Sequence, residues 1–280
     1  MTSGGVLRRI KRRGRGSDSR DMPPAWWPAL QSFARTALRA RSLHTAWALQ
    51  TRRVRLAEVR LPGFAGTFRL RTGTSDAHFL RALLERPLPP EYELPPEIVP
   101  RTILDIGANI GGVTAALARR YPAARIFAFE PLPENYALLL HNCGQFPLVR
   151  PLPYGLGART AQLTYARSDN PRNFGGGGFY AAAPTAAPGA VDLPVLAVGD
   201  ALMRFGIDAV DVIKIDTEGA EHDILTGLPP PVLRGVRAIV GELHGKPQDA
   251  ALLTFLDARF ELVTTARRGG TSWFRALRTA

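Results

Sequence analysis

The stretch of sequence that decides the fold is ILDIGANIGGVTAALARRYP, residues 103–122. It runs from a short apolar segment through a glycine-rich turn into helical spacing, and a second apolar segment, RIFAF, follows at 125–129. Further strands are expected where apolar segments recur, at 148–152, 212–215 and 238–241. Helices are expected near 111–121, 133–143 and 219–227. Strands that alternate with helices predict an α/β fold whose mostly parallel sheet is covered on both faces.

The glycine-rich turn and an acid after the next strand indicate a ligand that carries a ribose. Gly107 and Gly111 let the backbone turn sharply and approach a ligand that a Cβ atom would obstruct. Glu130 ends the next strand, where a carboxylate can accept the hydroxyl hydrogens of a ribose. A dinucleotide-binding dehydrogenase is the competing interpretation, but Asn109 replaces the second glycine of its G-x-G-x-x-G motif. The ligand is expected beyond the carboxyl ends of the strands.

Three separated blocks resemble the FkbM-type methyltransferases. The first is residues 103–122 followed by RIFAFEPLPENYALLLHN at 125–142, the second is VIKIDTEGAEHDILTG at 212–227, and the third is IVGELH at 239–244. Upstream, Thr74-Ser75-Asp76 also looks like a family element. The resemblance implies a Rossmann-like class I methyltransferase core that uses S-adenosylmethionine and methylates a hydroxyl, commonly on a sugar or a secondary metabolite.

The resemblance also implies which residues hold the cofactor. Those expected to hold the methionine part of S-adenosylmethionine are Asp105, Gly107, Ala108, Asn109 and Gly111. Glu130 is expected to hold the ribose. Tyr154 stands in PLPYGLGA, residues 151–158, where many methyltransferases place an acidic or amide side chain near the adenine. It is therefore the candidate to stack on the adenine or bond to it.

The second and third blocks place ionisable side chains after two strands that are expected to be neighbours. Methyl transfer to oxygen needs a group that removes the proton of the acceptor hydroxyl. The candidates for this base are His244, Asp216 and Glu242. Asp216 is expected nearest the cofactor cleft, so it is also a candidate cofactor ligand.

Two other interpretations apply to the same residues. In the block at 216–222, Asp216 or Thr217 would cap the following helix and Glu218 would favour its positive end, while Glu218 and Glu221 are equally open to an acid–base role. Asp216, Glu242 and His244 also have the side-chain types that bind a divalent metal. We do not predict a metal, because ligands inferred from strand ends alone are weak support.

Outside the core, the sequence predicts a basic disordered arm (1–23) and an extension of helices and a β-hairpin that ends in a proline-rich linker (24–100). The methyltransferase domain follows at 101–280. Residues 1–60 hold fourteen Lys or Arg against three Asp or Glu, so +11 of the net charge of +12 lies there. A glycine-rich insert at 168–188 is expected to be a lid or a surface loop.

Composition also narrows the compartment and the partners. A single cysteine, Cys143, excludes an internal disulfide and favours the cytoplasm. No apolar run reaches the length of about 18 residues that a transmembrane helix needs. The body of the chain is nearly neutral, which does not favour nucleic acid as the acceptor. The small-molecule acceptor is what the family resemblance implies. The predicted function is an O-methyltransferase. The alternative is a non-catalytic cofactor-binding or interaction protein whose basic arm contacts nucleic acid or an anionic surface.

Overall fold

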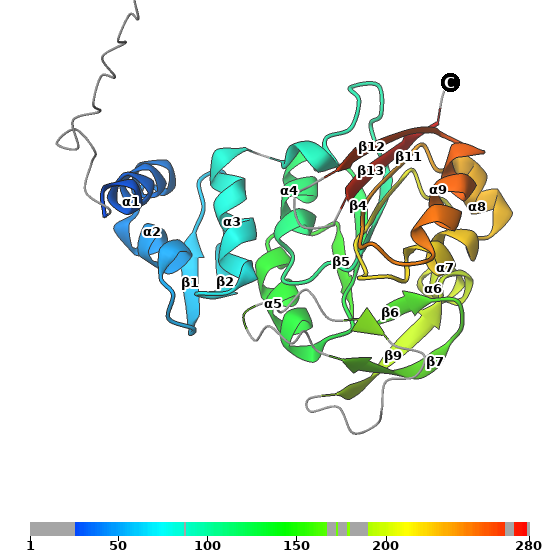
Figure 1. The fold of residues 1–280 in the computed structure, drawn as a ribbon, viewed down its shortest axis with the longest axis horizontal. Helices are drawn as coiled ribbons and strands as arrows, with labels where there is room; N and C mark the ends of the chain where they lie inside the picture. The colour runs from blue at the N-terminus through cyan, green and yellow to red at the C-terminus, as the bar shows by residue number, and fades with distance from the viewer. Residues whose placement is uncertain are drawn as a thin grey trace, which may run out of the picture.

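A seven-stranded sheet forms the centre of the protein in a computed structural model that describes residues 26–86, 88–166, 172, 178–179, 190–266 and 272–278 (Figure 1). Its strands, in chain order, are β3 (Thr102–Ile106), β4 (Arg125–Phe129), β5 (Val149–Leu152), β10 (Val212–Ile215), β11 (Ala238–Leu243), β12 (Glu261–Ala266) and β13 (Ser272–Leu277). All five strands expected from the apolar segments are present.

The order of strands across this sheet is β12-β13-β11-β10-β3-β4-β5. The five strands from β11 to β5 run parallel, and β13 lies antiparallel between β11 and β12. The chain winds outward from β3 through β4 to β5 and then returns to β10 on the other side of β3. The predicted α/β class and mostly parallel sheet are confirmed, and the order reverses between β3 and β10, where doubly wound sheets bind their ligands.

Alternate residues of each strand feed two separate cores, as the pleat of a sheet requires. Ile103 and Ala128 pack in one core, whereas their neighbours Leu104 and Phe127 pack in the other. The first core is covered by α4 (Gly112–Arg120) and α5 (Pro133–Cys143). The second is covered by α6 (Val198–Phe205), α7 (Glu221–Thr226), α8 (Pro230–Gly235) and α9 (Asp249–Asp257). Helices therefore cover both faces (Figure 1).

The N-terminal elements lie beside α4 and α5, at one end of the longest axis of the molecule (Figure 1). They are α1 (Trp27–Ala40), α2 (Leu43–Gln50), β1 (Leu56–Arg60), β2 (Thr67–Arg71) and α3 (Ser75–Glu85). The expected helices and hairpin are confirmed, whereas α3 was not anticipated. Phe68 of β2 and Leu80 of α3 pack in the same core as Ile103. The domain boundaries at 23/24 and 100/101 remain predictions.

The proline-rich linker before residue 101 is not extended throughout, because a 3-10 turn, η2 (Pro90–Tyr92), forms in it and buries Tyr92. A second, four-stranded sheet follows β5, in the order β6-β9-β7-β8. Its strands are β6 (Gly155–Gly157), β7 (Ala161–Ala166), β8 (Gly178–Phe179) and β9 (Val191–Ala197). The arm at 1–23 and nearly all of the insert at 168–188 lie outside the described residues. Among the helices that are described, none has the length and apolar character needed to cross a membrane.

Candidate functional site

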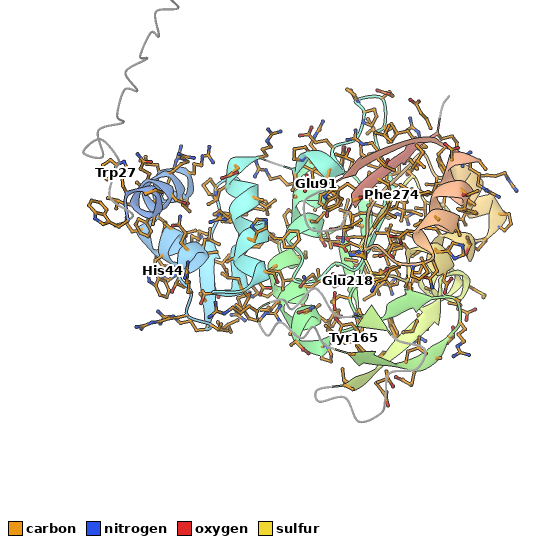
Figure 2. The ribbon with its side chains drawn as sticks, in the orientation of Figure 1. Trp27, His44, Glu91, Tyr165, Glu218 and Phe274 are labelled. Atoms are coloured by element: carbon orange, nitrogen blue, oxygen red, sulfur yellow. The ribbon has the colours of Figure 1, made fainter. Side chains whose placement is uncertain are left out.

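One cavity lies at the carboxyl ends of β3, β4, β10 and β11, at the switch point where the sequence places the ligand. The glycine turn forms one wall of this cavity. Glu130, Asp216 and Glu242 line it from the carboxyl ends of β4, β10 and β11. Figure 2 shows the labelled Glu218 between the main sheet and the smaller sheet that carries Tyr165, and both residues line the cavity. Residues from all three sequence blocks therefore meet in one place.

The glycine turn after β3 is held against two neighbouring strands. Gly107 has φ of +79°, and a Cβ atom there would lie 1.9 Å from the backbone oxygen of Asp216. The amides of Gly107 and Ala108 donate to the carbonyl of Phe129 at 3.0 and 2.9 Å. Only glycine fits position 107, because both its φ angle and the contact with the chain after β10 exclude a side chain. Gly107, Ala108 and Asn109 line the cavity, and their contact with a cofactor stays a prediction.

Asp105 and Gly111 lie behind the cavity and are not among the residues that line it. The Asp105 carboxylate is fully buried, with Lys214 Nζ 3.1 Å from its Oδ1 and the Thr114 hydroxyl donating to its Oδ2 at 2.6 Å. Lys214 also donates to the carbonyl of Gly107 at 2.7 Å. Asp105 thus supports the glycine turn through Lys214. Gly111, with φ of +85°, allows α4 to start where a Cβ atom would meet Cys143 Sγ at 2.9 Å.

Glu130 is buried in the cavity wall and is held by backbone amides. Its Oε2 accepts from the amide of Asn109 at 2.9 Å, and its Oε1 accepts from the amide of Leu132 at 3.0 Å. Burial outweighs these bonds and raises the pKa of Glu130 to about 7. A carboxylate has about four lone-pair positions. Glu130 therefore retains the capacity to accept hydrogen bonds from a bound diol.

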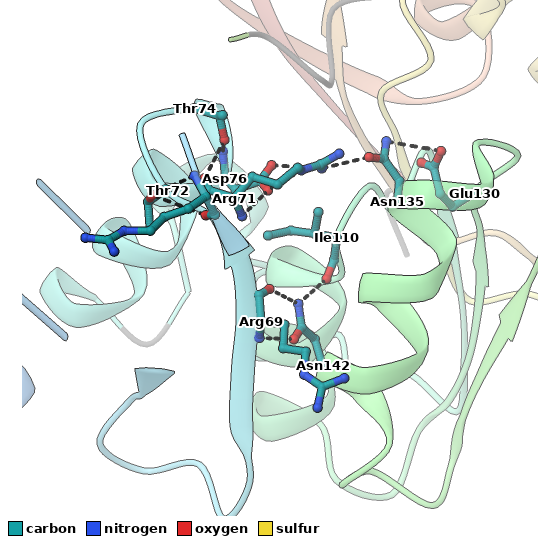
Figure 3. A network of polar contacts seen from close by, with 10 residues as sticks. Arg69, Arg71, Thr72, Thr74, Asp76, Ile110, Glu130, Asn135 and Asn142 are labelled. Carbon is teal, nitrogen blue, oxygen red and sulfur yellow. Dashed lines mark hydrogen bonds and ion pairs between the residues drawn. The ribbon is translucent and has the colours of Figure 1, made fainter. Parts of the chain in front are cut away.

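A polar network explains the upstream element Thr74-Ser75-Asp76 (Figure 3). Asp76 is buried and accepts from the guanidinium of Arg71 at 2.7 Å. Arg71 in turn donates to Asn135 Oδ1 at 2.8 Å, and Asn135 Nδ2 lies 3.4 Å from Glu130 Oε1. Nearby, Asn142 donates to the carbonyl of Ile110 at 2.7 Å and bonds the backbone of Arg69 in both directions. The hairpin and the start of α3 are thereby tied to the glycine turn and to Glu130.

His244 lies at the centre of a group of carboxylates. Its Nδ1 is 3.2 Å from Glu218 Oε2, and its Nε2 is 3.3 Å from Asp216 Oδ1 and 3.5 Å from Glu221 Oε1. Burial alone would lower the pKa of His244, but the interaction with Asp216 and the charges of Glu218 and Glu221 raise it to about 9. The ring is an imidazolium at neutral pH, and it is not among the residues that line the cavity.

The carboxylates around His244 differ in their readiness to take a proton. Burial would raise the pKa of Asp216, but His244 and Lys214 together lower it, so Asp216 stays ionised. Burial raises the pKa of Glu218 to about 7; His244 opposes this shift, and the charges of Asp216 and Glu242 add to it. Glu218 lines the cavity and has φ of +61°. A group with this pKa and exposure to the cavity is suited to proton transfer at neutral pH.

Neither Asp216 nor Thr217 caps the helix that follows them. Helix α7 begins after Ala220, and no side chain among the described residues caps it. Glu221 accepts from the amide of Thr217 at 2.8 Å and from its hydroxyl at 3.0 Å, so Glu221 stabilises the loop before α7.

Three residues of the site could bind a metal ion together. Asp216, Glu218 and His244 each offer a ligand atom within 4.8 Å of the other two. Glu242 lines the cavity but is not part of that group.

The remaining cavity wall is aromatic and apolar. Tyr154 lines it, and its hydroxyl accepts from Arg204 at 3.1 Å while its ring packs against Phe205. Its contact with an adenine stays a prediction. Among the lining residues that were not predicted are Ser75, Tyr92 and Lys214. Lys214 left a signal in the sequence, since a lone lysine inside an apolar strand needs a buried partner. Tyr92 left none, because a proline-rich segment usually runs over the surface.

Comparison with known proteins places residues 105–266 in the family described as the methyltransferase FkbM domain. The chain is 30% identical to the AMB antimetabolite synthetase AmbE of Pseudomonas aeruginosa, over 61% of this chain and 9% of AmbE. It is 28% identical to the hexuronic acid methyltransferase AglP of Haloferax volcanii, over 53% of this chain and 59% of AglP. It is 25% identical to the 2-O-methyltransferase NoeI of Sinorhizobium fredii, over 75% of this chain and 88% of NoeI. The chain thus spans only part of the first two relatives.

Proposed function

This chain belongs to the FkbM methyltransferase family, and we propose that it is an S-adenosylmethionine-dependent O-methyltransferase whose acceptor is a hydroxyl of a sugar or a secondary metabolite. Two similar proteins support the choice of acceptor, since one is named a hexuronic acid methyltransferase and another a 2-O-methyltransferase. The observation that carries the proposal is that the glycine turn, Glu130 and Glu218 line one cavity.

The residues of the cavity fit S-adenosylmethionine. Glu130 would accept from its ribose hydroxyls, and the turn at Gly107 and Ala108, which a side chain would fill, would take its methionine part. Asn109 Oδ1 is a buried acceptor with no hydrogen-bond partner among the described residues, as expected of an atom that a ligand completes. The aromatic ring of Tyr154 would face the adenine. When bound, this cofactor supplies a methyl group on a positively charged sulfur, which a nucleophilic oxygen displaces.

Glu218 is the residue that we assign to remove the proton of the acceptor hydroxyl. Glu218 lines the cavity, and the pKa of about 7 of its carboxyl group matches the task at neutral pH. His244 is the weaker candidate, because a ring that already carries a proton on each nitrogen cannot take another. We assign it instead to positioning Asp216 and Glu218. Glu242 lines the same cavity and remains an alternative base.

Two measurements test the proposed function. Calorimetry should detect binding of S-adenosylhomocysteine and none of NAD(P). Methyl-labelled S-adenosylmethionine should then label at least one member of a panel of sugar and metabolite acceptors. Binding of the dinucleotide alone would contradict the family assignment of the site. Cofactor binding without transfer to any acceptor would favour the non-catalytic alternative.

A further inference from the structure

Two residues that carry hydroxyl groups line the cavity from outside the region that matches the family. Ser75 begins α3 and Tyr92 ends η2, and both line the cavity although the family match starts at residue 105. The Ser75 Oγ and the Tyr92 hydroxyl are buried, and neither has a hydrogen-bond partner within the described part of the chain. A buried polar group without a hydrogen-bond partner costs free energy. A ligand that supplies the missing partner would remove this cost.

The position of Tyr92 is fixed by its surroundings. Its side chain is 1% exposed, and its ring forms a T-shaped pair with that of Trp273 of β13, with 5.1 Å between the ring centres. Burial, and then the charges of carboxylates that include Asp216 and Glu242, raise the pKa of Tyr92 well above its usual value. The phenol is therefore a neutral donor held within electrostatic reach of carboxylates at the cavity wall, and it bonds to none of them.

The Tyr92 phenol is a donor, the cavity carboxylates are acceptors, and the phenol bonds to none of them. The chemistry of a ligand group that binds to both follows from this arrangement. That group must accept from the phenol and donate to a carboxylate. A hydroxyl does both, whereas a carbonyl only accepts and an ammonium only donates.

We propose that Tyr92 forms an acceptor-binding subsite, in which its hydroxyl donates to the oxygen that is methylated while a cavity carboxylate receives the proton of that oxygen. The subsite selects alcohols, such as the hydroxyls of a sugar, and the part of the chain before the family match supplies it. The inference rests on the proposed O-methyltransferase function.

The test compares Tyr92→Phe with Tyr121→Phe, which alters another buried tyrosine that lines a separate surface pocket. The acceptors are methyl glucoside and methyl glucuronide with labelled S-adenosylmethionine. For Tyr92→Phe we expect kcat/KM for the acceptor to fall by about 10- to 100-fold and affinity for S-adenosylhomocysteine to change by less than about twofold. The Tyr121→Phe protein should match the wild type in both measurements.

Melting temperature separates a ligand contact from a structural one. Because the Tyr92 hydroxyl has no partner within the described part of the protein, Tyr92→Phe should melt at or above the wild-type temperature. A clear fall would show a structural bond and overturn the subsite, as would unchanged kcat/KM. A loss of S-adenosylhomocysteine affinity would assign Tyr92 to the cofactor and also overturn it.

Calorimetry of acceptor binding to the S-adenosylhomocysteine complex tests the proposed reaction and the proposed Tyr92 subsite separately. If the wild type binds the glycosides without methylating them and Tyr92→Phe binds them more weakly, the proposed reaction is wrong and the subsite stands. If both proteins bind and methylate equally, only the subsite is wrong. If neither glycoside binds the wild type, the assignment of the subsite to sugar hydroxyls is wrong.

Discussion

Lys214 Nζ lies 3.1 Å from Asp105 Oδ1, and both side chains are withdrawn from solvent. Burial would lower the pKa of Lys214, but the charges of Asp105 and Asp216 outweigh it and raise the pKa, so the ion pair persists at neutral pH. The same ammonium bonds the carbonyl of Gly107. One buried ion pair therefore connects β3, β10 and the turn that is expected to hold the cofactor.

Removing one partner of the Asp105–Lys214 ion pair should make the folded protein less stable. We expect Asp105→Asn or Lys214→Met to lower the free energy of unfolding by about 3 to 5 kcal/mol, because each leaves the other charge buried alone. The double variant Asp105→Asn/Lys214→Met should recover part of the loss. Urea denaturation of the four proteins measures the coupling, and strictly additive losses would contradict it.

Cofactor affinity should depend on the ionisation of Glu130. Ribose hydroxyls donate to the carboxylate, so binding favours the ionised form, and burial raises its pKa to about 7 in the absence of ligand. Affinity for S-adenosylhomocysteine should thus rise as the pH increases through 7 and level off above it. Glu130→Gln should bind about 10- to 100-fold more weakly and lose this pH dependence. A pH dependence that survives in Glu130→Gln would assign it to another group.

Replacing Glu218 and replacing His244 should have different effects on turnover. Glu218→Gln should lower kcat by about 10²- to 10⁴-fold while cofactor affinity stays within a few-fold, because the general base is lost. In the wild type, kcat should rise with pH through about 7, as Glu218 loses its proton. His244→Gln removes the neighbouring positive charge that lowers the pKa of Glu218, so this rise should move to higher pH. If kcat of His244→Gln keeps the wild-type pH dependence, His244 does not control the pKa of Glu218.

Chelation of divalent metals should leave turnover nearly unchanged. Both nitrogens of His244 face carboxylates, at 3.2 Å from Glu218 and 3.3 Å from Asp216, so a positive ring already offsets their charges. We expect EDTA to change kcat by less than about twofold, since no cation is needed to balance this cluster. Loss of activity that Mg²⁺ or Mn²⁺ restores would instead identify Asp216, Glu218 and His244 as metal ligands.

The sequence alone predicted the parts of the fold that local chemistry controls. Apolar segments of strand length gave the five parallel strands, and glycines at 107 and 111 gave the turn, because positive φ and close backbone contact are properties of single positions. The strands β12 and β13 and the helix α3 were not anticipated. Their apolar residues alternate weakly, and their stability comes from packing on β11 and on α4.

The roles within the site were decided by contacts across the sheet, which no local pattern encodes. Asp105 is 109 positions from Lys214 in the chain, and parallel pairing of β3 with β10 makes them neighbours. This pairing turns Asp105 into a support of the turn. His244, directly after β11, is not among the lining residues, whereas Tyr92, whose turn η2 contacts β11 and β13, is one of them. Sequence fixes which side chains are available at each strand end. Burial and the surrounding charges, which exist only in the folded chain, decide which of them face the ligand and which carry a proton.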